Sequence, residues 1–515
     1  MSILNHKNDE EVRQWKKSSI VRHDLFNFES KIDYGLELTE KNKTKYLITT
    51  YFFIPRSLII NRDSYSKEQF FSDLNNRIRF KTPKMSIEEI LNEQNELSPM
   101  NTILRLLNDI ERGNSNLSII VKVQRELCLL ADIIKVSLRD RFNYIHYNYN
   151  EIIRQYHIPD LVHKYLKLIE SLQSRLKIIG NRIYLTQIPI KLRESFQLVD
   201  EYISLQIEKW LTQFLNGFEE IVNEENKSIM IELIEKEQIH RENLNSSLII
   251  SENNSNENFS YQEGIMKKYV QSVLYLEKKK KDPKSQSLEI FYSIAAGVAM
   301  FFSLFFGFLI LSFFPLYSIP FIIGSVVIYM LKDRIKDNIR GISQKAVGSL
   351  FPDQRIDIVD GFNKEKIGKS KEIVNFAPKN KIPQEILRIR RSSNISSIEE
   401  RGKPEQVIVY EKKITLFNKK IKQFHTRRKD ISDVIRFNIK EFLRYADDPI
   451  QYISKWNVDK HKIENIPVSK VYHLNLILKL TEFNGKKIKK TSFKKFRVII
   501  DQKGIKRVLE PEFVL

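Results

Sequence analysis

Two glycines followed by a lysine and a serine come closest in this chain to a phosphate-binding motif. They are Gly361 and Gly368, with Lys369 and Ser370 directly after them. A phosphate-binding loop needs four residues between its glycines, so that backbone amides converge on the phosphate. Here six residues separate them, and Asp501, the nearest match to a downstream acidic residue, falls in a predicted hairpin turn. The spacing therefore argues against nucleotide hydrolysis.

The other reactive side chains form no recognisable constellation. His157 and His163 are six residues apart, so they do not share a helix face, and no cysteine–histidine cluster exists. The single cysteine, Cys128, lies in a mostly apolar run, where a packed thiol is expected. Asp447 and Asp448 precede a proline, an ordinary setting for a turn or helix cap. We assign no catalytic residue, no metal ligand and no cofactor, and favour binding over catalysis.

Lysines alternate with aromatic residues near the C-terminus, in a pattern that suits an anionic partner. Phe493 and Phe496 lie between basic residues that could hold phosphates, while the rings stack on bases or dock on lipid. Three interpretations stay open: an edge strand protected by its lysines, a surface for anionic lipid headgroups or an acidic protein, and a nucleic-acid surface. The candidate contact residues here are Lys486, Lys487, Lys489, Lys490, Lys494, Lys495 and Arg497.

Charge is unevenly distributed along the chain. The 515 residues include 85 Lys and Arg against 64 Asp and Glu, a formal net charge of +21. Residues 332–515 hold 43 basic against 23 acidic residues, whereas residues 1–331 hold 42 against 41. This asymmetry indicates an anionic partner for the C-terminal region, and a lysine-rich coding bias is the alternative reading.

One long segment is unsuited to water. Residues 290–331 contain no Asp, Glu, Lys, Arg or His. A straight helix of that length would reach about 60 Å, roughly twice the thickness of the hydrocarbon core. Pro315 and Pro320 interrupt the segment and favour a reversal. We predict a transmembrane hairpin with spans at 290–313 and 319–331, and a re-entrant hairpin is the alternative because the second span is short.

Basic residues on both sides of this segment predict its orientation. Lys332 and Arg334 follow it, and the positive-inside rule then puts both flanks in the cytoplasm. We expect a two-span protein of the cell membrane with cytoplasmic N- and C-termini. The basic flank before the segment is a second candidate contact for an anionic partner, at Lys278, Lys279, Lys280 and Lys281.

Small residues recur every four positions in the first predicted span. Ala295, Ala299, Ser303 and Gly307 therefore lie on one helix face, which lets another helix approach closely. The favoured partner is the second span near Gly324, and the alternative is a second copy of the chain in a homo-oligomer.

The region before the hairpin shows mixed and then helical patterns. Residues 43–54 are β-branched and aromatic and predict a strand. Ser66 and Ser86, each with Gln or Glu three residues later, predict helix starts, the first helix running to about Arg79. From about 98 to 241 apolar residues recur at three and four positions, which predicts a helical bundle.

The region after the hairpin mixes irregular and regular patterns. Residues 341–397 look poorly regular, 407–417 predict a strand, and 431–446 and 449–456 predict helices. Residues 472–483 alternate in polarity before Asn484-Gly485, a strong hairpin signal, and two further strands follow at 486–500 and 505–509. The chain should therefore end in a three-stranded antiparallel meander.

The expected fold class is an α+β membrane protein: a mainly helical N-terminal cytoplasmic region, a two-helix transmembrane hairpin, and a basic α+β C-terminal region ending in the meander. The expected segments before the hairpin are a small mixed α/β unit at 1–97, a helical bundle at 98–245, and a linker with a basic juxtamembrane helix at 246–289. The hairpin occupies 290–331. An irregular connector at 332–404 and a basic α+β domain at 405–515 follow it.

The favoured function is that of a membrane-anchored interaction or scaffold protein, with the lipid bilayer and an anionic lipid or acidic protein as partners. Three alternatives stay open: an oligomerising effector that perturbs the bilayer, an enzyme of unrecognised class, and a membrane-tethered nucleic-acid-binding protein.

Overall fold

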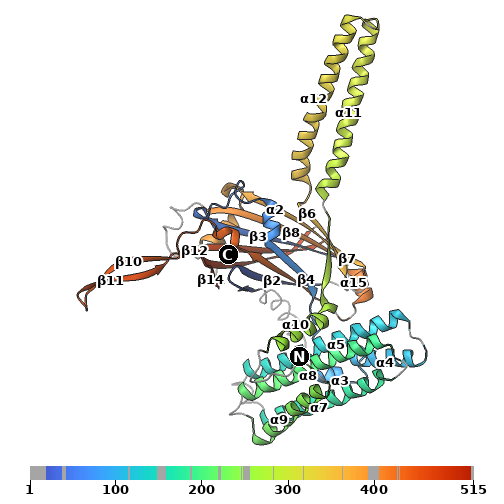
Figure 1. Cartoon of the computed structure of the whole chain (residues 1–515), viewed down its shortest axis with the longest axis vertical. Coiled ribbons are helices and arrows are strands. Elements are labelled where there is room, and N and C mark those ends of the chain that lie inside the picture. Colours follow the sequence, from blue (N-terminus) through green and yellow to red (C-terminus); the bar gives the residue numbers. More distant parts are fainter. Residues whose placement is uncertain are drawn as a thin grey trace.

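The computed structural model has a β-sandwich, a helical bundle, a long pair of helices and a projecting two-stranded arm (Figure 1). It mixes helices with antiparallel sheets, as the composition and periodicity predict. It describes residues 19–511 apart from 37–41, 114–115, 148–157, 186–187, 218–221, 245, 247–255, 282, 317, 362, 393–404, 426, 428–429 and 486.

The larger sheet of the sandwich has eight antiparallel strands in the order β14-β13-β12-β3-β8-β7-β6-β5. Its central strand β3 forms where β-branched and aromatic residues predict a strand, and it pairs with both β8 and β12. The bounds are β3 (Lys43–Pro55), β5 (Leu276–Lys281), β6 (Gln354–Asp360), β7 (Lys366–Ala377), β8 (Glu405–Phe417), β12 (Tyr472–Asn484), β13 (Lys487–Asp501) and β14 (Gly504–Leu509).

The smaller sheet has four antiparallel strands, β1 (Ser19–Arg22), β2 (Asn27–Gly35), β9 (Asp430–Asn438) and β4 (Leu74–Phe80), in that order. Its inner face packs on the larger sheet, with the rings of Phe437 and Phe52 5.2 Å apart. At one seam the Ile505 amide donates to Leu25 O at 2.7 Å, and at the other Arg79 bridges to Tyr275. The two sheets therefore close around one core.

The sandwich is discontinuous in sequence. Strands from residues 19–80 lie beside strands from residues 354–509, while the helical bundle is inserted between β4 and β5, and the helix pair between β5 and β6. The segments 1–97 and 405–515, expected as separate units, thus contribute neighbouring strands to the same sheet. Strand pairing over such separations leaves no local pattern in the sequence.

The bundle forms from amphipathic helices, as their three-and-four spacing predicts. Short helices α2 (Lys67–Asp73) and α3 (Ile87–Leu91) precede it, and Ser66 and Ser86 cap them as predicted. The bundle helices are α4 (Pro99–Glu111), α5 (Leu117–Tyr147), α7 (Ile158–Ile183), α8 (Ile190–Gly217), α9 (Glu224–Asn243) and α10 (Glu257–Gln271).

The long helices α11 (Pro283–Phe313) and α12 (Ile319–Leu350) pack against each other and extend away from the sandwich (Figure 1). Among the described residues one helix segment, 288–313 of α11, is long and apolar enough to cross a membrane. Ala295 and Ala299 are buried, and Gly324 lies against Ile310 of the facing helix. Ser303 and Gly307 are half-buried on the same face. The small-residue face is therefore occupied, at least in part, within the pair.

Several predicted elements are wrong. The predicted helices at 431–446 and 449–456 are mainly strand β9, the 3-10 turn η4 (Lys440–Leu443) and strand β10 (Ile450–Asn457). The part of 341–397 that the structure describes is largely regular, with the end of α12, then β6, β7 and α13 (Gln384–Arg391). The lysines expected in a juxtamembrane helix form strand β5, and α2 stops at Asp73 because β4 begins there. Sheet pairing overrides local helical spacing in these cases.

The C-terminal meander is confirmed, with β12 paired to β13 and β13 paired to β14. In the segment 246–289, expected to begin as a linker, residues 247–255 lie outside the described residues and α10 begins at Glu257. Smaller elements are β11 (Lys462–Ser469), which pairs with β10, α15 (Asn418–Phe424), η1 (Arg56–Leu58), η2 (Ser272–Leu274) and η3 (Lys379–Lys381).

Candidate anion-binding surface

Four basic side chains line up across four neighbouring strands of the larger sheet. Lys281 of β5 lies opposite Arg355 of β6, Arg355 opposite Lys371 of β7, and Lys371 opposite Lys413 of β8. Directly opposite residues share a face and lie about 5 Å apart, and like charges in such positions repel. We call these four residues the basic row.

The basic row lies on the outer face of the sandwich. On β6, β7 and β8 residues next to the row point into the core, as with Ile356 on β6 and Lys412 and Ile414 on β8, all of which are buried. Lys281, Lys371 and Lys413 are exposed, and Arg355 is half-buried. These cations are therefore available at the surface.

A second row beside the first adds more positive charge. Lys279 lies opposite Asp357, Asp357 opposite Lys369, and Thr415 separates Lys369 from Lys45 of β3. Asp357 also accepts Lys281 at 2.9 Å and Lys366 at 2.6 Å. Burial works against ionisation, but these two ion pairs hold the pKa of Asp357 below its usual range. A single carboxylate, Asp357, thus pairs with two lysines of this face.

The cations of this face repel one another. The pKa of Lys369 is lowered, first by burial and then by the charges of Arg355, Lys371, Lys366 and Lys43. A lysine whose pKa falls for this reason gains from any anion that approaches the group, because the anion offsets the repulsion. The face is therefore suited electrostatically to bind phosphate or carboxylate groups.

The basic row lies where the apolar helices leave the sandwich. Lys281 is the last residue of β5, two positions before the first residue of α11, and Arg355 is the second residue of β6, shortly after α12. Asp353 holds the second junction to the sheet: it accepts the Val374 amide at 2.7 Å and pairs with Lys67 at 3.0 Å. Two residues of the row thus lie on the strands that lead into and out of the helix pair.

The lysine cluster identified in the sequence divides between two environments. Lys279, Lys280 and Lys281 are exposed on β5. Lys278 is half-buried, and its ammonium group donates to Asn76 O of the facing sheet. Burial, followed by the charge of Lys412, lowers the pKa of Lys278 to about 8. Alternation along β5 therefore assigns Lys278 to the seam between the sheets rather than to an outside partner.

The basic residues of β13 also divide. Lys487, Lys489 and Lys490 are exposed, Lys486 lies outside the described residues, and Lys494, Lys495 and Arg497 are buried.

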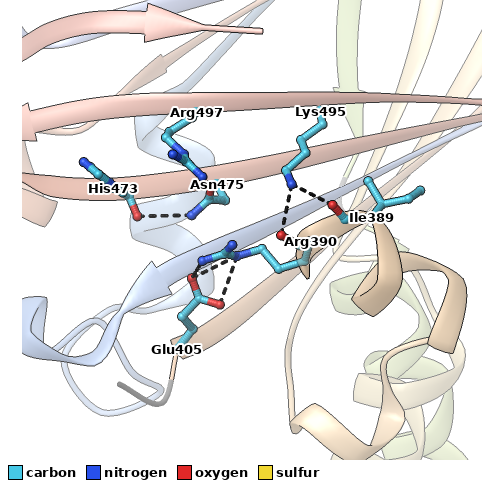
Figure 2. Close-up of polar contacts among 7 residues, drawn as sticks. All are labelled: Ile389, Arg390, Glu405, His473, Asn475, Lys495 and Arg497. Atoms are coloured by element: carbon cyan, nitrogen blue, oxygen red, sulfur yellow. Dashed lines mark hydrogen bonds and ion pairs between the residues drawn. The ribbon is translucent and has the colours of Figure 1, made fainter. Parts of the chain in front are cut away.

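Two of the three buried basic residues of β13, Lys495 and Arg497, are shown in Figure 2 with their partners within the chain. Lys495 Nζ donates to Ile389 O at 2.6 Å and to Arg390 O at 3.0 Å, at the C-terminal end of α13. Arg497 Nε donates to Asn475 Oδ1 at 3.2 Å. A cation beside the last carbonyls of a helix is favourable. Lys495 therefore holds α13 on the outer face of the sheet, whereas Arg497 joins β13 to β12.

A buried ionic cluster inside the sandwich is a feature that sequence reasoning missed. Lys412 Nζ of β8 lies 2.5 Å from Asp433 Oδ2 of β9, and neither side chain is exposed. Tyr410 OH donates to Glu372 Oε2 at 2.9 Å, and Ser370 Oγ lies 3.2 Å from the other carboxylate oxygen. The alternation of β8 could have revealed this cluster. Lys412 is an even number of positions from the buried apolar residues around it, so its side chain points into the same core.

The near match to a phosphate-binding loop has another role. Lys369 and Ser370 lie in the middle of strand β7, and a Cβ on Gly368 would come within 2.9 Å of Thr415 O. β7 continues to Ala377, so no helix begins directly after Ser370 that could receive a phosphate on its N-terminus. Gly368 is therefore needed for close strand approach.

The other singled-out side chains have structural partners. Cys128 is buried in α5, and burial, followed by Asp132, raises the pKa of its thiol to about 12. His163 bonds to Asn226, and His157 lies outside the described residues. Asp447 accepts a hydrogen bond from Tyr472. Among the described residues no group of three or more His, Cys, Asp or Glu side chains could hold a metal ion.

No protein-family model, curated protein or solved structure matches this chain.

Proposed function

We propose that this chain is a membrane-anchored interaction protein, held by α11 and α12 as a two-span hairpin and bound through the basic row to anionic lipid headgroups of the same membrane. The observation that carries the proposal is the position of the basic row at the root of the apolar helices. Cations beside a membrane anchor are already close to the leaflet, so its negative surface potential attracts them without a separate association step.

The anchor is supported by apolar surface that the rest of the chain leaves uncovered. Only 11% of the most apolar 18-residue stretch of α11 is buried against the rest of the chain. Phe308 and Phe313 are 71% and 77% exposed. A continuous apolar surface of this size would be unfavourable in water, whereas hydrocarbon matches it.

A second pass is supported by the strand pairing on either side of the helices. β5 before α11 pairs with β6 after α12, so both junctions lie on the same side of any membrane. If α11 crosses the bilayer, the chain must return through it before reaching β6. The apolar part of α12 is short, and Lys332, whose ammonium group lies 4.4 Å from the Tyr329 ring, suits the interface where long cations snorkel.

Basic residues at both junctions support a cytoplasmic position for the sandwich, the bundle and both termini. Each lysine or arginine near an anionic leaflet contributes about 1 kcal/mol. The four residues of the basic row would thus add on the order of 4 kcal/mol, a contribution that added salt reduces.

The headgroup contact is tested on the full chain in proteoliposomes. Vesicles of phosphatidylcholine are compared with vesicles that also contain phosphatidylserine, and acylation of each lysine by an amine-reactive reagent is followed by mass spectrometry. We expect Lys281, Lys371 and Lys413 to react several-fold more slowly when phosphatidylserine is present. Lys487 and Lys490, exposed at the far end of β13, are the matched controls and should react equally in both.

Equal acylation of the basic row in both vesicle types would overturn the lipid contact. Protection by added RNA or by an acidic polypeptide, with none by phosphatidylserine, would instead assign the row to the corresponding alternative partner. The anchor has a separate test, since alkaline carbonate should leave the full chain in the membrane.

A further inference from the structure

The strands β10 and β11 form a two-stranded arm that projects from the sandwich (Figure 1). They pair with each other and belong to neither large sheet. Almost every residue of both strands is exposed. An isolated hairpin of two strands is marginally stable in water, so an arm of this kind calls for a partner.

Apolar side chains cover both faces of the arm. Tyr452 and Trp456 share one face and are 68% and 57% exposed, and Ile453 and Ile466 lie opposite each other on the second face. Exposed apolar residues that gather in this way mark an interaction site. The full set is Ile450, Tyr452, Ile453, Trp456, Val458, Ile463, Ile466 and Val468.

The two outer edges of the arm differ in their chemistry. β11 carries Pro467, which has no amide hydrogen, and the charged residues Lys462 and Glu464, all of which discourage pairing with another strand. β10 has no proline or glycine, and its only charged residue is Lys455. Natural proteins protect exposed strand edges, so an unprotected edge beside a protected one indicates a pairing surface.

We infer that β10 pairs antiparallel with β10 of a second copy of this chain, giving a four-stranded sheet across a two-fold axis. Facing residues must lie on the same side of the sheet, so the axis passes through a residue of β10. An axis at Ile453 places Ile450 of one copy opposite Trp456 of the other, and Lys455 opposite Gln451. This register joins apolar side chains and keeps the two lysines apart.

A membrane fits the arm less well than a second copy does. The tip of the arm carries Asp459, Lys460 and Lys462, and Lys455 lies opposite Glu464 in its middle. Burying these charges in hydrocarbon would be costly. In Figure 1 the arm extends sideways, roughly perpendicular to α11 and α12, so it does not point in the direction of the apolar helices.

Cysteine crosslinking of the full chain tests the pairing. In Ile453→Cys the two thiols of a dimer face each other across the axis, with Cα atoms about 5 Å apart, which suits a disulfide. The native Cys128 is buried and does not interfere. We expect copper-phenanthroline to convert most of the detergent-solubilised I453C protein to a covalent dimer at low protein concentration.

The matched control is Ile466→Cys, which lies opposite Ile453 on β11 and on the same face. Its mate in the dimer would be three strand spacings away, about 14 Å, too far for a disulfide. A dimer formed equally by I453C and I466C, or by neither, would overturn the proposed register.

A second variant tests the association without a crosslink. Ser454→Pro removes an amide hydrogen from β10, whereas Asn465→Pro places the same change at the facing position of β11. In sedimentation of the detergent-solubilised chain we expect S454P to be monomeric and N465P to remain dimeric. Monomeric wild-type protein would overturn the inference, and it would leave the membrane anchor and the basic row untouched.

Discussion

Lysines of this protein are either buried in the core or exposed at the surface, and the alternation of side chains along a strand decides which. Lys412 and Lys413 are adjacent on β8, yet the first is fully buried against Asp433 and the second is exposed in the basic row. Burial raises the pKa of Asp433, and the ammonium group of Lys412 opposes that rise. Loss of either partner would leave an uncompensated buried charge, which typically costs about 3–5 kcal/mol.

Lys278 should make stability depend on pH in the alkaline range. Its pKa is about 8 in the folded chain, lowered first by burial, against about 10.4 when unfolded. Between these values the unfolded chain binds more protons, so the free energy of unfolding rises with pH. Lys278→Met should remove this rise. Urea denaturation across that range, compared with wild type, measures it.

Lys279→Met is the control for this titration, since Lys279 lies on the same strand but is exposed on the outer face. It should retain the wild-type dependence on pH. Parallel curves for wild type and K278M would show that Lys278 is not a titrating group of the seam.

At the scale of elements, local signals predicted several strands, including β3 and β8, but they predicted strand pairing only where the partners are close in sequence. The Asn484-Gly485 turn and the alternation before it predicted β12, β13 and β14, because each of these strands pairs with the next. Residues 431–446 contain β9, whose neighbours β2 and β4 lie several hundred residues away, and the spacing there suggested a helix. The pairing with β2 and β4 therefore decided the element where the local spacing was ambiguous.

Gly504 controls the seam between β14 and β1. Its φ is +133°, and a Cβ there would lie 2.3 Å from Leu25 O, which accepts the Ile505 amide. Gly504→Ala should therefore lose the seam bond as well as incur backbone strain, which alone costs about 1–3 kcal/mol. Gly113→Ala has the same sign of φ with open space around it and should lose less. Urea denaturation compares them, and equal losses would mean that the seam contributes nothing.

The whole molecule is a closed sandwich that carries two insertions, and contacts of charged side chains join the first insertion to it. Arg125 of α5 donates to His425 Nδ1 at 2.5 Å, and His425 Nε2 donates to Asp360 Oδ2 at 2.5 Å. Arg427 pairs with Glu126 of α5. These five side chains are largely buried and form a latch between bundle and sandwich.

Breaking this latch should separate the unfolding of the two parts. We expect the double variant Arg125→Leu, Arg427→Leu to unfold in two calorimetric transitions in detergent, whereas wild type unfolds in one. The matched control is Arg139→Leu, an exposed arginine of α5 that pairs with its neighbour Asp140. A single transition in the double variant would mean that apolar contacts alone couple bundle and sandwich.

Several features of this protein follow from local sequence. The charge-free segment at 290–331, the capping residues Ser66 and Ser86, the helical spacing of 98–241 and the terminal meander depend on residues that are neighbours in the chain. The solvation and hydrogen bonding of these features depend on residues within a few helical turns or adjacent strands. Periodicity and turn residues therefore suffice to predict them.

Only the tertiary structure decided which lysines are available to a partner. The basic row unites residues from 281 to 413 because four strands pair in register, whereas Lys278, Lys495 and Arg497, singled out by their charge, are held inside the chain. Strand parity and pairing determine whether a side chain meets solvent or core. Both depend on residues far away in sequence, so charge counts along the chain could not reveal them.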